Sequence, residues 1–179
     1  MAGHSDNDLG LPTISDPEKV AIVIAPYYTK ISSAQLASAR GVLDRAGVQH
    51  ETIEVPGSLE IPAAVALAHR MSNFDGYVAL GCVIRGRTSH YDVVVNESAR
   101  GLMLLGLQGV AAGNGIITVE NMEQAEERAD ADRLDTAGGA AVAALHLIAL
   151  ARRFGGTKKG VGFTQDIQLA GDSEGPTTA

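Results

Sequence analysis

Four short strand-like runs, separated by stretches with helical spacing, constrain the fold of this chain more than any other feature. The runs span Val20–Ile24, His50–Val55, Tyr77–Val83 and Gly115–Val119. The first run is apolar throughout and rich in β-branched residues, which is typical of a strand buried on both faces of a sheet. Strands that alternate with helices form a parallel sheet covered by helices. The sequence therefore predicts a flavodoxin-like, three-layer α/β/α domain with a four-stranded parallel sheet.

The stretches between these runs carry the periodicity and the end signals of helices. Ser58 is expected to cap a helix that carries Pro62 in its first turn. Asn121, followed three residues later by Gln124, resembles a capping box. The expected helices span Ile31–Ala46, the segment that follows Ser58, Tyr91–Leu107, Met122–Arg128 and Ala137–Phe154.

The two ends of the chain differ in composition from its centre. At 179 residues the chain is long enough for one domain with a sizeable core. Residues 1–18 are polar with scattered Gly, Pro and Asp, and residues 157–179 show no hydrophobic period. We therefore expect a flexible arm over 1–18, the folded domain over 19–156 and a flexible tail over 157–179.

Charge and hydropathy exclude several classes of partner. The net charge of −7, without a basic stripe, argues against a nucleic-acid binder. The longest apolar run, from Ala140 to Leu145, is too short to cross a bilayer even when extended to Ala151. No signal-peptide pattern opens the chain, and its one cysteine, Cys82, suits a reducing compartment. We expect a soluble, cytoplasmic protein with neither a membrane nor a nucleic-acid partner.

The densest group of chemically active side chains follows the third strand. Arg85, Arg87, Thr88, His90 and Asp92 all occur within this short segment. Parallel α/β sheets bind ligands where the carboxyl ends of strands meet loops, because backbone N–H groups are unpaired there. Arg87 and Thr88 suit an anion, and His90, with Asp92 two residues on, suits proton transfer near neutral pH. This segment is expected to be an active-site loop.

Three residues outside this loop have alternative interpretations. Tyr27 ends the first strand, where its ring suits either stacking on a heterocycle or packing over the sheet edge. Cys82 has no base beside it in sequence, which indicates a buried structural thiol rather than a nucleophile. Arg128 is by default a solvated ion-pair partner of a nearby carboxylate. The candidate carboxylates are Glu123, Glu127 and Asp132.

Motifs for metals and nucleotides are missing from the sequence. The histidines are dispersed and no cysteine pair or HExxH motif occurs, so a metal site is not expected. Neither GxGxxG after the first strand nor GxxxxGK[ST] is present, which weighs against a dinucleotide or P-loop enzyme.

Five segments, in this order, resemble the 6,7-dimethyl-8-ribityllumazine synthase family. They are Val55–Pro62 (VPGSLEIP), Ala79–Gly86 (ALGCVIRG), Thr88–Asp92 (TSHYD), Asn96–Ser98 (NES) and Asn114–Ala125 (NGIITVENMEQA). The resemblance covers most of the expected domain, and the combination is highly specific. The GIITVEN form looks most like the pentameric synthases of alphaproteobacteria.

The resemblance implies the penultimate reaction of riboflavin biosynthesis, catalysed by a transferase. In this reaction 5-amino-6-(D-ribitylamino)uracil condenses with 3,4-dihydroxy-2-butanone 4-phosphate. An imine forms, phosphate leaves, and the ring closes with loss of water. The resemblance implies that no cofactor and no metal are needed, and that the ligands are these two small-molecule substrates.

The resemblance also implies roles for individual residues. Tyr27 would stack on the pyrimidine, at a position where the family usually has Phe or Trp. Arg87 and Thr88 would meet the butanone phosphate, and His90 would relay protons. The pyrimidine and ribityl pocket would be lined by Ser58, Leu59, Glu60, Cys82, Val83 and Ile84.

A site shared between subunits follows from the same resemblance. Asn114 and Arg128 would come from the neighbouring subunit of a homopentamer, with Arg128 gripping the phosphate. Two departures bear on this expectation. Arg87 stands where the family usually has a small, acidic or amide residue, so that it either tightens anion binding or obstructs it. Residues 129–136 replace a segment that commonly carries Gly and lysines in the family. This segment helps decide whether pentamers assemble into a sixty-subunit shell. We favour the pentamer.

These departures keep a second hypothesis open. The chain would then be a catalytically weak, synthase-like protein that binds a flavin or lumazine, or serves only in assembly. The presence of Thr88, His90 and Arg128 favours the enzyme, because a binding protein needs the stacking ring but no proton relay.

Overall fold

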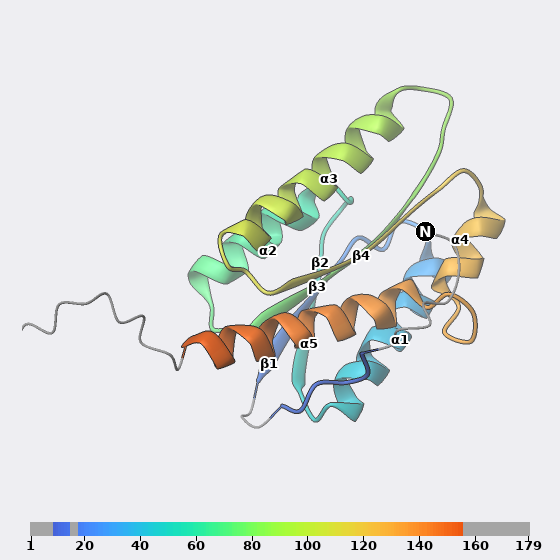
Figure 1. The fold of residues 1–179 in the computed structure, drawn as a ribbon. Helices are drawn as coiled ribbons and strands as arrows, with labels where there is room; N and C mark the ends of the chain where they lie inside the picture. Colours follow the sequence, from blue (N-terminus) through green and yellow to red (C-terminus); the bar gives the residue numbers. More distant parts are fainter. Residues whose placement is uncertain (1–8, 15–17, 156–179) are drawn as a thin grey trace, which may run out of the picture.

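A four-stranded parallel sheet lies at the centre of the computed structural model, which describes residues 9–14 and 18–155 (Figure 1). Its strands are β1 (Lys19–Ile24), β2 (Gln49–Glu54), β3 (Gly76–Ile84) and β4 (Ala112–Val119). They pair in the order β2-β1-β3-β4, which leaves β2 and β4 at the two edges. The predicted parallel four-stranded sheet is confirmed.

Helices cover both faces of the sheet, giving three layers (Figure 1). On one face lie α1 (Thr29–Arg45), α4 (Met122–Ala129) and α5 (Thr136–Gly155). On the other face lie α2 (Glu60–Met71) and α3 (His90–Leu107), which also contact each other. The flavodoxin-like architecture expected from the alternating pattern is therefore confirmed.

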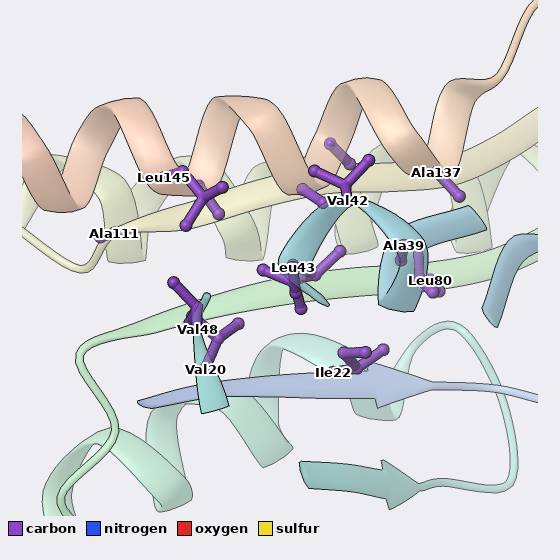
Figure 2. Close-up of a cluster of buried hydrophobic side chains, with 14 of the residues drawn as sticks. Val20, Ile22, Ala39, Val42, Leu43, Val48, Leu80, Ala111, Ala137 and Leu145 are labelled. Atoms are coloured by element: carbon purple, nitrogen blue, oxygen red, sulfur yellow. The ribbon is translucent and has the colours of Figure 1, made fainter. Parts of the chain in front are cut away.

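The apolar side chains of β1 pack in two hydrophobic clusters, one on each face of the sheet. Val20 and Ile22 point to the α1 and α5 face, where they pack in one cluster with Leu43 and Leu145 (Figure 2). The intervening residues, such as Val23, join a second cluster beneath α2 and α3. A side chain of this size contributes about 1.5–3 kcal/mol when fully buried, so β1 anchors both layers.

Close packing of α5 on β4 depends on a glycine. A Cβ atom added at Gly113 would lie 1.9 Å from the carbonyl oxygen of Ala140 in α5, which is far inside van der Waals contact. Gly113 therefore lets the helix backbone approach the strand directly. Strand β4 begins at Ala112, ahead of the predicted start at Gly115, because Ala112 already pairs with Tyr77 of β3.

Other boundaries differ from the predictions in ways that affect the site. The predicted cap at Ser58 is wrong: α2 starts at Glu60, Leu59 precedes it in helical conformation, and no side chain caps it. Ser58 is instead buried, because its hydroxyl packs against β3 at Gly81. The expected cap of α4 by Asn121 is confirmed, since Asn121 Oδ1 accepts a 3.0 Å hydrogen bond from the Gln124 N–H, while the Gln124 side chain accepts from the Glu120 N–H rather than from that of Asn121.

Helix α5 is longer than its apolar run suggested. It spans 20 residues with a mean hydropathy of 1.2, and it is the one helix in the described ranges that passes a length and composition test for crossing a membrane. The short apolar run from Ala140 to Ala151 is thus part of a longer helix, which passes this test by length and composition alone. Buried Ala141, Ala144 and Leu145 pack on the sheet, as in the core helix of a globular domain.

The expected flexible arm (1–18) and tail (157–179) lie mostly outside the described residues. The described part of the arm, residues 9–14, runs beside α5, where the Gly10 carbonyl oxygen lies 2.9 Å from His146 Nε2. This contact gives His146 a packing partner.

Candidate active site at the carboxyl edge of the sheet

A cavity of about 280 Å³ opens where the loops after β1, β2 and β3 meet. Six of the predicted site residues line it, namely Tyr27, Ser58, Cys82, Val83, Ile84 and His90. Four further lining residues were not predicted, namely Tyr28, Pro56, Gly57 and Val94. The structure thus gathers three loops distant in sequence around one space, as the parallel topology requires.

The β3 side of the cavity is formed by the carboxyl end of that strand. Val83 and Ile84 are half-buried and give this wall an apolar surface. Burial raises the pKa of the Cys82 thiol from its ordinary 9.0 to about 11, so the thiol stays protonated at neutral pH. The structural interpretation of Cys82 fits this environment better than a nucleophilic one, because the thiolate is the reactive form.

Two tyrosines stand at the end of β1. The rings of Tyr27 and Tyr28 meet edge to face, with centroids 5.0 Å apart and planes at 75°. Tyr27 is 74% exposed, so the space beside its ring is open, whereas burial raises the pKa of the Tyr28 hydroxyl. Of the two interpretations of Tyr27, this exposure favours stacking on a planar ligand.

The loop after β2 approaches the cavity through close contacts. A Cβ atom added at Gly81 would lie 2.7 Å from Ser58 Oγ, so that glycine makes room for the serine. A Cβ atom at Gly57 would lie 2.9 Å from Glu60 Oε2, which places the Glu60 carboxylate beside this lining residue. Leu59 is half-buried and does not line the cavity.

His90 enters the cavity from the start of a helix. It is the first residue of α3, one position earlier than predicted, and Val94 lines the same space one turn later. Asp92, which the sequence pointed to as a companion of His90, instead pairs with Arg85, whose Nη1 lies 3.2 Å from Asp92 Oδ1. The i to i+4 spacing from His90 was the available signal for Val94.

The remaining predicted residues do not line this cavity within one chain. Arg87 and Thr88 are exposed on the loop between β3 and α3, shortly before His90. Asn114 is exposed on the edge strand β4 opposite Ala79, and its Oδ1 accepts a 3.0 Å hydrogen bond from the Ile116 N–H. Asn114 therefore lies well down the strand from the cavity.

Arg128 is also separate from the cavity, because it lies on α4. Its Nη1 donates a 3.3 Å hydrogen bond to the backbone oxygen of Gln124. Within the described part of the chain no carboxylate forms an ion pair with it, and Glu127 pairs with Arg133 at 3.1 Å instead. The default interpretation of Arg128 as an ion-pair partner was wrong, and Arg128 as a residue is half-exposed.

A larger cavity of about 770 Å³ lies between α1, α4 and the segment before α5. It contains none of the predicted site residues. Over residues 9–14 and 18–155, no group of His, Cys, Asp and Glu side chains is arranged to hold a metal ion. The smaller cavity at the sheet edge is therefore the candidate active site.

Comparisons with known proteins identify the family of the chain. The family model described as 6,7-dimethyl-8-ribityllumazine synthase matches residues 17–152. The chain belongs to this family. A synthase of Jannaschia sp. is 76% identical over 163 residues, which cover 91% of this chain and 92% of the relative.

More distant relatives carry the same description. The 6,7-dimethyl-8-ribityllumazine synthase of Sphingopyxis alaskensis is 56% identical and that of Bartonella tribocorum is 54% identical, each over 76% of this chain. These alignments cover 96% and 91% of the two relatives. The resemblance recognised from the sequence motifs is confirmed.

Proposed function

We propose that this chain catalyses the lumazine-forming step of riboflavin biosynthesis. The substrates are 5-amino-6-(D-ribitylamino)uracil and 3,4-dihydroxy-2-butanone 4-phosphate, and the reaction releases phosphate and water. Family membership over residues 17–152 carries this proposal. The cavity that brings Tyr27, Ser58 and His90 together supports it from the structure.

The cavity suits a reaction between two substrates that already react in solution. The exposed Tyr27 ring offers a stacking surface for the pyrimidine, and the apolar wall of Val83 and Ile84 supports its edge. Holding amine and ketone in register supplies much of the acceleration, because the step becomes effectively unimolecular. His90 then relays the protons that imine formation and loss of water require.

Anionic substrate groups require positive charge near His90. Arg87 and Thr88 are exposed in the loop that precedes it. We assign the butanone phosphate to this side of the site. Arg128 and Asn114 then contact the ligand from a neighbouring subunit, because neither reaches the cavity of its own chain.

A homopentamer accounts for the surfaces left uncovered in one chain. Met71 of α2, Met103 and Leu107 of α3 are 80%, 64% and 77% exposed, and the edge strand β4 has no partner among the described residues on its outer side. Large exposed apolar side chains of this kind mark protein interfaces. Sedimentation of the full chain should give a mass about five times 18.5 kDa.

We also infer a cytoplasmic location, because a sequence that cannot form an intrachain disulfide suits a reducing compartment. The single Cys82 has no cysteine with which to form an intrachain disulfide.

The test of the function is lumazine formation from the two purified substrates, followed by its fluorescence. A rate well above the uncatalysed reaction is the expected result. The alternative is a binding or assembly protein without significant catalysis. Such a protein would bind lumazine, but lumazine would form from the two substrates only at the uncatalysed rate. No observation on the described residues favours that alternative.

A further inference from the structure

Arg85 directly follows the cavity wall, and its backbone is fixed in place. Its N–H donates a 2.9 Å hydrogen bond to the Val119 carbonyl oxygen, which extends the pairing of β3 with β4 by one residue. The preceding residue, Ile84, lines the cavity. The side chain of Arg85 therefore starts from a rigid point at the edge of the site.

The guanidinium of Arg85 joins two separate elements. Its Nε lies 2.9 Å and 3.1 Å from the two carboxylate oxygens of Glu120, in the turn between β4 and α4. Its Nη1 lies 3.2 Å from Asp92 Oδ1, and its central carbon lies 4.0 Å from the centroid of the Tyr91 ring. The planar, delocalised guanidinium can pair with carboxylates and stack on a ring at once, which the compact ammonium of lysine cannot reproduce.

The Glu120 end of this bridge is itself well anchored. The Glu120 N–H donates a 2.9 Å hydrogen bond to Gln124 Oε1, while Asn121 caps the Gln124 N–H. These bonds tie the turn to the first turn of α4. The backbone of Glu120 is thus fixed, and its carboxylate, 58% exposed, extends from this point to Arg85.

The other end of the bridge holds a helix start that lacks a side-chain cap. Ser89 precedes α3 and makes no capping hydrogen bond with its side chain. The first helical residue is His90, which lines the cavity, and the next two are Tyr91 and Asp92, both of which contact Arg85. Arg85 therefore holds the turn from which the His90 imidazole projects.

We propose that Arg85 is a positioning residue, which ties Tyr91 and Asp92 to Glu120 and so fixes the imidazole of His90 against the substrate cavity. It lines no part of the cavity, so it acts through His90 rather than on the ligand. Its effect on turnover rests on the proposed function, whereas its effect on the His90 ring does not.

The kinetic test is Arg85→Met, which keeps a long side chain and removes the charge. Turnover should fall by about 10- to 100-fold, because a displacement of about 1 Å can cost about 10²-fold. The KM for the pyrimidine substrate should change less than kcat, and Arg85→Lys should recover only part of the loss. The control is Arg40→Met, whose guanidinium donates a 2.9 Å bond to Thr52 away from the cavity and whose loss should leave turnover unchanged.

A double substitution separates positioning from general damage. If Arg85 acts through His90, adding Arg85→Met to His90→Ala should cause almost no further loss of turnover, because coupled residues are not additive. An equal fold-loss in both backgrounds would overturn the proposal. Should Arg85→Met fail to fold, Glu120→Gln removes the charge of the anchor, and its loss should likewise vanish in the His90→Ala background.

A measurement that does not depend on activity tests the positioning role of Arg85 separately from the proposed lumazine synthesis. The ring proton resonance of His90, assigned by its absence in His90→Ala, should shift in Arg85→Met and stay unmoved in Arg40→Met. An unmoved resonance in Arg85→Met would refute the positioning role even in an active enzyme. A wild-type chain without lumazine synthesis would refute only the proposed function.

Discussion

At the scale of single residues, the Cys82 thiol offers a test of how sheltered the cavity wall is. Its pKa is raised by burial from 9.0 to about 11, so the folded state holds its proton more tightly than the unfolded state. This stabilising contribution is fully present below pH 9 and is lost as the pH rises towards 11. At pH 8, iodoacetamide should label the folded chain about 100-fold more slowly than the urea-unfolded chain. The labelling is followed by mass spectrometry. Equal rates for the folded and unfolded chains would contradict the burial of the Cys82 thiol.

His90 is the residue whose removal should affect the chemistry itself. Proton transfer by a positioned histidine contributes about 10²–10⁴-fold, whereas the benefit of holding the substrates together remains without it. His90→Ala should therefore reduce kcat by about 10²-fold, at the lower end of this range, without abolishing turnover. Steady-state kinetics with both substrates varied provide the measurement. Undiminished turnover would remove His90 from the mechanism.

At the scale of secondary-structure elements, the contact between β4 and α5 should tolerate no added atom at Gly113. Because a Cβ there would meet the Ala140 carbonyl oxygen, Gly113→Ala should destabilise the fold by about 1–3 kcal/mol. Gly139→Ala is the matched control, since no atom lies within 4 Å of its added Cβ; it should be neutral or stabilising by about 0.5–1 kcal/mol. Thermal unfolding at one fixed protein concentration compares them. Equal midpoints would show that α5 can move away from β4.

The elements were more predictable from sequence than the contacts between them. The β1 run and the cap of α4 by Asn121 have local signals, and both were predicted correctly. Ser58 has the composition of a cap but serves a tertiary contact with Gly81, which no local pattern reveals. The Arg85–Glu120 ion pair joins residues 35 positions apart, so only the register of β3 with β4 brings them together.

At the scale of the whole molecule, a site divided between subunits allows two impaired variants to complement each other in mixed oligomers. If Arg128 serves the neighbouring cavity, Arg128→Ala should mainly raise the KM for the butanone phosphate, because a charge-assisted contact is lost. Co-expressing Arg128→Ala with His90→Ala should restore about one quarter of the sites, since random mixing pairs an intact His90 with an intact neighbouring Arg128 at that frequency. Activity of the mixed oligomers no higher than the mean of the two variants would place both residues in the same subunit's site.

The strand order also determines at which stage of synthesis the hydrophobic core can form completely. Val20 in the inner strand β1 pairs with Gly76, and the face of β1 that carries Val20 is covered by α5 residues such as Leu145 (Figure 2). A ribosome-bound chain that has released only the first three strands leaves this apolar surface open. Among the described elements α5 emerges last, so it closes this side of the core, and shielding by a chaperone would be most useful just before α5 docks.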